Sequence, residues 1–144
     1  MAGVRMGRAM ITLDTSGLFA LINRADPDHA QVRTALFADP GPYFIPAGIL
    51  AEIAYLIERR LGMEVLGKFI GDLESDAFSF ECGEEDLPRI RELVSRYADL
   101  SLGFSDASVV ACAERASAGR VLTLDRRHFD VVAREGNITP FPER

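Results

Sequence analysis

Short apolar runs alternate along the chain with longer segments in which apolar residues recur at helical spacing. The short runs predict strands, which lie at 10–13, 43–45, 77–81, 121–124 and 138–141. The longer segments predict helices, which lie at 15–23, 27–38, 46–61, 63–73, 84–97 and 106–118. Strands separated by helices require crossover connections. The pattern therefore predicts an α/β domain with a mostly parallel central sheet and helices on both faces.

Two of the predicted strands end in the same way. Ile11-Thr12-Leu13 is followed by Asp14, and Leu122-Thr123-Leu124 is followed by Asp125. If both strands are parallel members of one sheet, the two aspartates lie at its carboxyl edge, where α/β proteins bind ligands. The predicted helix that begins at Asp106 leads back to the second of these strands, so Asp106 belongs to the same edge.

Glu52 is a further acid in an unusual place, one turn into the helix that follows the 43–45 strand. Its neighbours Leu50, Ala51, Ile53 and Ala54 are all apolar. Burying an unpaired carboxylate is costly, so Glu52 needs a counter-charge, a metal ion or an orientation that frees it to the rim.

Crowded carboxylates repel one another unless a cation lies among them. Mg²⁺ prefers oxygen ligands and commonly binds a few carboxylates together with substrate phosphate. The four acids thus predict phosphodiester hydrolysis by a metal-activated water. Cys82 and Cys112 are far apart and predict two buried, reduced thiols rather than a metal site. His128 is predicted to be a surface or packing residue, and Asp99 a loop residue.

Each acid also has a purely structural interpretation. Asp14 and Asp106 stand where helix N-caps are expected, and aspartate is a favoured cap. Asp125 precedes two arginines and suits a turn. Glu52 would be stable if it paired with an arginine.

Composition places the chain among globular proteins of one domain. Of its 144 residues, 48% are hydrophobic and 26% charged, and no apolar run approaches the ~20 residues that span a bilayer. The N-terminus lacks the apolar core of a signal peptide, so a cytoplasmic location is expected. Residues 1–9 are predicted to be a flexible tail and 10–144 the domain. A net charge of −6 argues against a broad basic surface for nucleic acid, so any such contact must be local.

Four segments together resemble the PIN-domain ribonucleases, in particular the VapC-type toxins of toxin–antitoxin pairs. They are Leu13-Asp14-Thr15-Ser16, Ala51-Glu52-Ile53, Leu102-Gly103-Phe104-Ser105-Asp106-Ala107-Ser108 and Thr123-Leu124-Asp125-Arg126-Arg127-His128-Phe129. The resemblance extends from about residue 10 to residue 142. It implies a three-layer α/β/α PIN-like fold and an endoribonuclease that depends on Mg²⁺ or Mn²⁺.

The resemblance also implies roles and partners. Asp14 and Asp106 would be the main metal ligands, and Glu52 and Asp125 would complete an acidic quartet through water or a second ion. Thr15 or Ser16 could steady the carboxylate of Asp14. Proteins of this type act on RNA, usually form homodimers and are inhibited by a VapB-type antitoxin.

Two other functions remain open at this point. A phosphatase of the haloacid dehalogenase type would also have an aspartate after an apolar strand, but it needs a second one two residues later, where Ser16 stands. A non-catalytic PIN-fold module that only binds a partner protein would be expected to have lost acids, and none of the four is lost.

Overall fold

The computed structural model describes residues 10–142, which are built around one sheet of five strands. The strand order is β3-β2-β1-β4-β5, and every neighbouring pair is parallel. The strands are β1 (Ile11–Leu13), β2 (Tyr43–Pro46), β3 (Ser79–Glu81), β4 (Arg120–Leu122) and β5 (Thr139–Phe141). The prediction of a mostly parallel sheet is therefore confirmed. The predicted tail, residues 1–9, lies outside the described residues.

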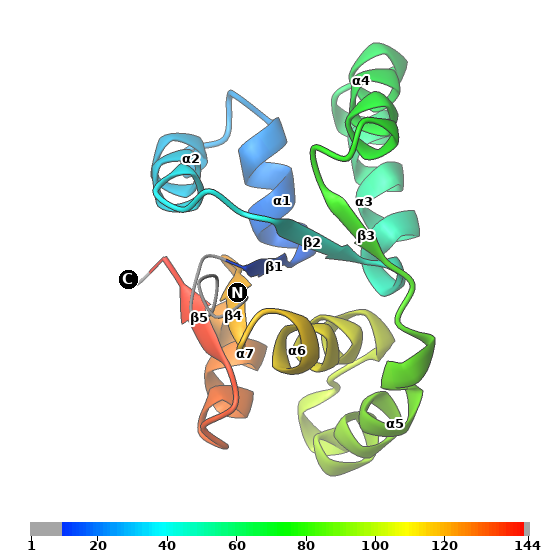
Figure 1. The fold of residues 1–144 in the computed structure, drawn as a ribbon, viewed down its shortest axis with the longest axis vertical. Coiled ribbons are helices and arrows are strands. Elements are labelled where there is room, and N and C mark those ends of the chain that lie inside the picture. Colours follow the sequence, from blue (N-terminus) through cyan, green and yellow to red (C-terminus); the bar gives the residue numbers. More distant parts are fainter. Residues whose placement is uncertain (1–9, 143–144) are drawn as a thin grey trace, which may run out of the picture.

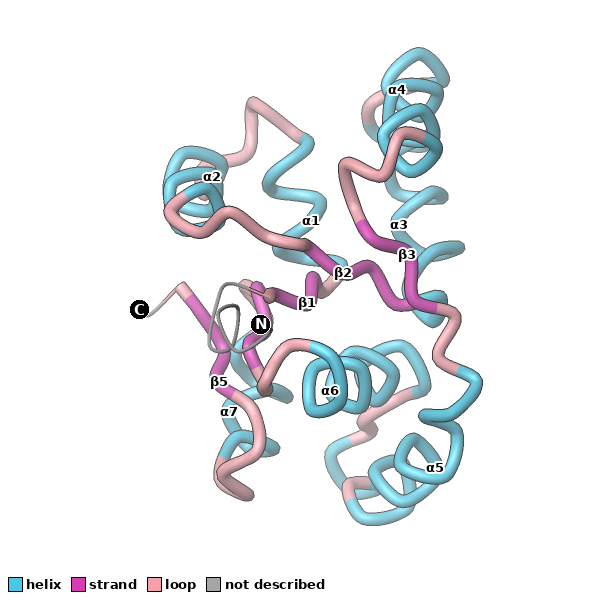
Figure 2. Tube along the Cα trace, in the orientation of Figure 1, coloured by secondary structure: helices cyan, strands magenta, loops and turns pink. Residues whose placement is uncertain are grey.

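Helices cover both faces of the sheet and give the predicted three layers (Figure 1). One face carries α1 (Thr15–Ile22), α2 (His29–Phe37), α3 (Ala47–Arg60) and α4 (Met63–Glu74). The other carries α5 (Leu87–Arg96), α6 (Phe104–Ala116) and α7 (Arg126–Ala133). Two short 3₁₀ turns, η2 (Glu84–Asp86) and η3 (Ala98–Leu100), flank α5. Figure 2 shows how the loops join these layers around the short central strands.

The crossovers explain why the helices divide in this way. From β1 the chain moves to β2 and then β3 on one side of the sheet, and it then passes to β4 and β5 on the other side. Because parallel crossovers are right-handed, movement in opposite directions places the connecting helices on opposite faces. β1 and β4 are neighbours whose chains leave toward different faces, which makes their carboxyl ends the switch point of the fold.

The core lies between the sheet and the inner faces of the helices. Ile11, Leu13 and Leu122 are fully buried in the strands. Ile49, Ile53 and Ile57 of α3 are also fully buried, as expected for residues four apart on one helix face. Within residues 10–142, none of the helices has the length and apolar character needed to cross a bilayer.

Two glycines permit close approaches beside the switch point. A Cβ atom on Gly17 of α1 would lie 2.6 Å from the carbonyl oxygen of Leu122. A Cβ atom on Gly48 of α3 would lie 2.1 Å from Oγ of Ser108 in α6. Side chains at these positions would push α1 away from β4 and α3 away from α6. The two glycines therefore allow the elements that carry the candidate site residues to pack closely against one another.

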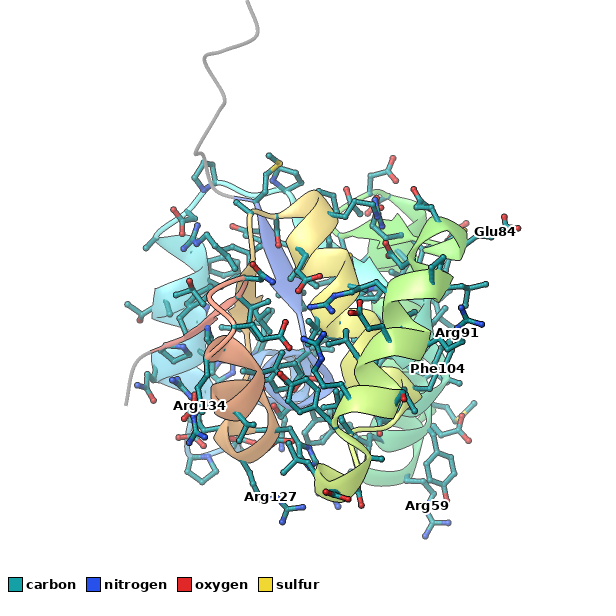
Figure 3. The ribbon with its side chains drawn as sticks, turned by 90° about the horizontal axis from the view of Figure 1, so that it is seen from below. Arg59, Glu84, Arg91, Phe104, Arg127 and Arg134 are labelled. Atoms are coloured by element: carbon teal, nitrogen blue, oxygen red, sulfur yellow. The ribbon has the colours of Figure 1, made fainter. Side chains whose placement is uncertain are left out.

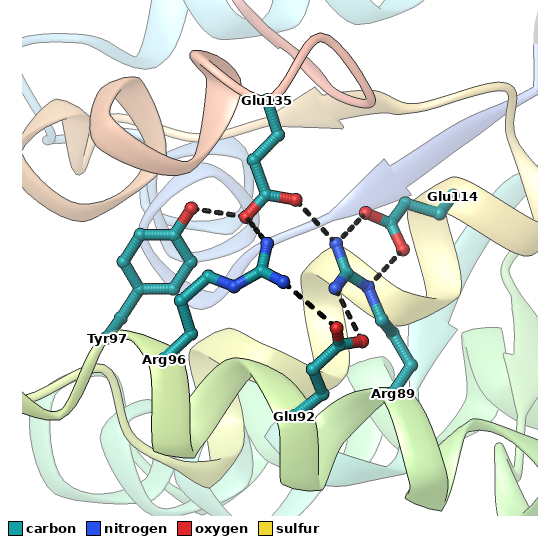
Figure 4. Close-up of polar contacts among 6 residues, drawn as sticks. All are labelled: Arg89, Glu92, Arg96, Tyr97, Glu114 and Glu135. Atoms are coloured by element: carbon teal, nitrogen blue, oxygen red, sulfur yellow. Dashed lines mark hydrogen bonds and ion pairs between the residues drawn. The ribbon is translucent and has the colours of Figure 1, made fainter.

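An ion-pair network joins α5 to α6 and to the turn that follows α7 (Figure 4). Its members are Arg89, Glu92, Arg96, Tyr97, Glu114 and Glu135. The Arg89 guanidinium donates to both carboxylate oxygens of Glu114 at 2.8 Å and to Glu135 at 2.9 Å. Such planar two-point contacts are the strong form of the arginine–carboxylate interaction.

Beyond small shifts at other element ends, the structure differs from the sequence predictions in α6, α7 and Cys82. α6 begins at Phe104 rather than Asp106, and α7 occupies a segment for which no helix was predicted. Cys112 is buried as predicted, but Cys82 is exposed. The prediction for Cys82 is wrong because this residue follows β3, the edge strand, where the chain leaves the sheet for η2.

Candidate active site

Asp14 follows β1 directly and is almost completely buried, with a relative exposure of 4%. Its Oδ2 atom accepts hydrogen bonds from the hydroxyl of Thr123 at 2.7 Å and from that of Ser16 at 3.0 Å. The backbone N–H of Leu124 donates to Ser16 Oγ at 2.9 Å, which fixes this hydroxyl in turn. The carboxylate of Asp14 is thus held in one orientation by groups from α1 and the end of β4.

Burial raises the pKa of Asp14 from 3.8 to about 6, because a charged carboxylate loses its hydration there. The hydrogen bond from Thr123 acts against this shift, whereas the negative charge of Asp106 adds to it. Asp14 therefore bears an uncompensated electrostatic cost near neutral pH, and a bound cation would remove that cost.

Asp106 and Asp125 come from two different helices and face the same histidine. Asp106 lies in the first turn of α6, and Asp125 occupies the N-cap position of α7. Nδ1 of His128 lies 3.0 Å from Oδ2 of Asp106 and 3.5 Å from Oδ2 of Asp125. One ligand atom from each of the three residues lies within 4.8 Å of the others. The arrangement gathers two oxygens and one nitrogen around a small space.

The pKa of Asp106 is also raised above its ordinary value. Burial is the main cause, the neighbouring His128 opposes it, and the charges of Asp125 and Glu52 raise the pKa further. Asp106 is the residue that links the acids electrostatically, since its charge raises the pKa of Asp14 as well. The four carboxylates therefore act on one another as a single cluster.

Glu52 reaches this cluster from α3. It lies one helical turn beyond Gly48, the point at which α3 and α6 make their closest approach. Its side chain is exposed, and its Oε1 atom accepts a hydrogen bond from the hydroxyl of Thr15 at 2.6 Å. Among the described residues Glu52 has no arginine or lysine partner, so of the solutions that the sequence left open, exposure at the rim and a bound metal ion remain.

The cap interpretation of Asp14 and Asp106 and the arginine pairing of Glu52 are not supported, whereas Asp125 does lie in the short connection between β4 and α7. Neither Asp14 nor Asp125 makes a side-chain cap hydrogen bond, although both stand at N-cap positions. Asp106 lies inside the helix rather than at its cap, because α6 begins at Phe104. Within residues 10–142, none of the four acids forms an ion pair with an arginine or lysine. Asp99 is exposed in η3.

His128 is the site residue that sequence reasoning missed. Its side chain is only 13% exposed and belongs to the cluster, whereas a surface or packing role was predicted. The signal was present in the spacing, since residues three apart on a helix lie on the same face. A helix predicted from Arg126 onward would have placed His128 beside Asp125.

Exposed arginines lie near the cluster without neutralising it. Arg127 is adjacent to His128, and its Nη2 atom lies 3.5 Å from Nε2 of that histidine. Arg59 lies two helical turns beyond Glu52 on α3. In Figure 3 both arginines project outward from the same end of the molecule.

Comparison with known proteins identifies the family of this chain. The model of the PIN domain family matches residues 11–135. Ribonuclease VapC26 of Mycobacterium tuberculosis is 31% identical over 121 residues, which cover 83% of this chain and 90% of that protein.

Two solved structures have the same fold. The structure of M. tuberculosis VapC20, a sarcin-ricin loop cleaving toxin, matches with a TM-score of 0.74 and 21% identity, covering 85% of this chain and 94% of the other. A chain of VapBC2 from Rickettsia felis, bound to a DNA fragment from its promoter, matches with a TM-score of 0.67 and 16% identity, covering 94% of this chain and 100% of the other. The chain therefore belongs to the PIN domain family, as a relative of the VapC ribonucleases.

Proposed function

We propose that this protein is a metal-dependent endoribonuclease and the toxin of a VapBC-type pair. The observation that carries the proposal is the meeting of four carboxylates at the switch point of the sheet without an arginine or lysine partner among the described residues. The raised pKa of the buried Asp14 supports it, because a bound cation would offset the cost of ionising this carboxyl group.

The donor set fits a hard divalent cation, Mg²⁺ or Mn²⁺. Asp14 and Asp106 would hold it, with Asp125 and Glu52 completing the set directly or through water. When bound, such an ion lowers the pKa of water and offsets the charge that develops on a phosphate. Ser16 and Thr123 fix the direction of the Asp14 carboxylate, and Thr15 does the same for Glu52.

RNA is the proposed substrate, and its contacts are expected to be local. With a net charge of −6, the protein has no excess of basic residues to attract a long stretch of nucleic acid. Arg127 and Arg59 are exposed on the rim and would contact the phosphates that flank the one being cut. The relatives, Ribonuclease VapC26 and the sarcin-ricin loop cleaving toxin VapC20, support RNA as the substrate class.

A VapB-type antitoxin is the proposed partner, and a homodimer the proposed assembly. The matching R. felis chain comes from a VapBC2 structure, which supports the antitoxin as a partner. The acidic site would suit a basic inhibitory segment. Action on cellular RNA would place the protein in the cytoplasm.

Cleavage of purified RNA, followed by sequencing of the new 5′ ends, tests the proposal. We expect discrete cuts with Mg²⁺ or Mn²⁺, no cuts with EDTA, and loss of cutting in Asp106→Asn. Asp130→Asn is the matched control, because Asp130 is half exposed on α7 and pairs with Arg126 rather than with the cluster. Equal cutting by Asp106→Asn and the parent would disprove the proposed site.

The same experiment addresses the two other functions. A folded parent that binds metal but cuts no RNA would favour a non-catalytic PIN module. Hydrolysis of a phosphate monoester would favour the haloacid dehalogenase type. That chemistry lacks its second aspartate here, because Ser16 donates a hydrogen bond to Asp14 from the position where it would stand.

A further inference from the structure

His128 is one of two histidines in the chain, and its ring lies inside the acidic cluster. It stands three residues after Asp125, so both side chains share one face of the first turns of α7. Nδ1 lies 3.0 Å from Oδ2 of Asp106 and 3.5 Å from Oδ2 of Asp125. The imidazole is therefore as close to the two carboxylates as a ligand of the same ion would be.

The nitrogen lies at ion-pair distance from Asp106 Oδ2, but its direction does not satisfy hydrogen-bond geometry. Nδ1 of His128 is buried, and within residues 10–142 it has no partner whose direction satisfies hydrogen-bond geometry. Buried polar atoms are rarely left unpaired, because each one costs free energy. The nitrogen and the two carboxylate oxygens are thus close enough to share one ion but are not joined by a well-directed hydrogen bond.

The spacing of the three atoms suits a six-coordinate ion. With metal–ligand bonds of about 2.1 Å, ligands at right angles lie about 3.0 Å apart and opposite ligands about 4.2 Å apart. The separations of 3.0 and 3.5 Å, with all three atoms within 4.8 Å, fall in or near this range. Little rearrangement would be needed to bring them around one cation.

We propose that His128 Nδ1 joins Asp106 and Asp125 as a ligand, so that the site selects a transition-metal ion such as Mn²⁺ over Mg²⁺. This inference rests on the proposed function, since it concerns the same metal-dependent site. Imidazole binds transition metals well, whereas Mg²⁺ prefers oxygen ligands and retains its waters. An all-carboxylate site would have a weaker preference.

The same contacts of His128 are compatible with a different role, that of a residue that positions a carboxylate. If Nε2 of His128 accepts a hydrogen bond from Arg127, which lies at 3.5 Å, then Nδ1 carries the proton and can only donate toward Asp106. His128 would in that case position a carboxylate and would not bind the ion. The two roles differ in whether nitrogen is bonded to the metal.

The two roles of His128 can be distinguished by pulsed electron paramagnetic resonance. The experiment uses Mn²⁺ added to the full-length protein in a buffer free of amines. We expect coupling of the manganese electron spin to a directly bound ¹⁴N nucleus, which changes to a ¹⁵N pattern in uniformly ¹⁵N-labelled protein. The coupling should be lost in His128→Ala and kept in His29→Ala. His29 is the matched control, because its Nδ1 lies 2.9 Å from the carbonyl oxygen of Ala20, away from the acids.

Calorimetry with each metal alone gives a second readout. We expect His128→Ala to weaken Mn²⁺ binding about tenfold or more and Mg²⁺ binding by much less. Absence of nitrogen coupling in the parent would overturn the inference even if the variants failed to fold, and so would coupling that persists in His128→Ala. RNA cutting without nitrogen coupling defeats only this inference, whereas absence of cutting with either metal defeats the proposed function.

Discussion

The two ends of α7 carry carboxylates in opposite circumstances. At its N-terminal end, Asp125 faces Asp106 and a histidine, and the nearby Asp14 has a raised pKa. Just beyond its C-terminal end, Glu135 accepts hydrogen bonds from Arg89, Arg96 and Tyr97 (Figure 4). Burial alone would raise the pKa of Glu135, but these donors lower it to about 2.

The presence or absence of partner cations distinguishes an ion-pair network that stabilises the fold from a site that binds metal. In the network around Glu135, the protein supplies its own cations and joins three elements that are distant in sequence. In the acidic cluster it supplies almost none, so the repulsion persists until a cation arrives. Carboxylates matched by arginines stabilise the fold, whereas unmatched carboxylates lower its stability and create affinity for metal.

Asp14→Asn should produce the largest effect, and its effects on activity and stability should be opposite. We expect RNA cutting to fall by about 10³-fold, because a main metal ligand is lost. Because burial raises the pKa of Asp14 from 3.8 to about 6, the folded state binds this proton more tightly than the unfolded chain does. The stability that this proton supplies is fully present below pH 3.8 and is lost as the pH rises through about 6. Asparagine avoids that loss, so the metal-free variant at pH 8 should be more stable by about 1–3 kcal/mol.

Urea unfolding with and without Mg²⁺ measures the second part of this prediction. The cation should stabilise the parent and not the variant, so that the difference shrinks or reverses when it is added. A metal-free variant less stable than the parent would show that Asp14 is a structural carboxylate like Glu135.

Arg89→Ala should have the converse effect. It removes the guanidinium that binds Glu114 and Glu135 and leaves both carboxylates, 18% and 17% exposed, with fewer partners. We expect the free energy of unfolding to fall by about 2–4 kcal/mol, with the ratio of Mn²⁺ to Mg²⁺ affinity unchanged in the folded protein. Arg91→Ala is the control, because Arg91 is exposed on the same helix and points away from the network (Figure 3).

The two regions also differ in how far the sequence could predict them. Asp14 and Asp125 were found because each ends an apolar strand, and the parallel sheet brings strand ends to one edge. Asp106 followed from the path of the chain, although the helix begins two residues earlier than predicted. Glu52 depended on resemblance, because the apolar periodicity of α3 leaves the direction of this side chain open.

The network was not predicted, for a physical reason. Arg89 meets Glu114 and Glu135 across 25 and 46 residues, and no periodicity in one segment indicates which distant element its outer face will meet. α7 was missed for a different reason, since Phe129 and Val132 are buried at helical spacing but the segment is short and begins with three polar residues. With α7 unassigned, the position of His128 could not be derived.

Glu135→Gln should change how stability depends on pH. Because the pKa of this group is lowered from 4.5 to about 2, its contribution is present above pH 4.5 and is lost as the pH falls toward 2. We expect the variant to be about 1–2 kcal/mol less stable at pH 7, allowing for partial solvent screening, and equal to the parent near pH 2. Thermal unfolding between pH 2 and pH 7 measures this, and parallel curves over that range would contradict it.

Glu92→Gln should have the smallest effect, although Glu92 contacts two arginines of the same network. It pairs with Arg89 at 2.9 Å and Arg96 at 3.0 Å, one turn before and one turn after it on α5. However, its side chain is 51% exposed, three times as much as that of Glu135. Exposed helical pairs contribute only a few tenths of a kcal/mol and are screened by salt. We therefore expect a loss below about 1 kcal/mol in urea unfolding, abolished in about 1 M NaCl. A loss as large as that of Glu135→Gln would mean that the number of ion pairs, and not their burial, determines what the network contributes.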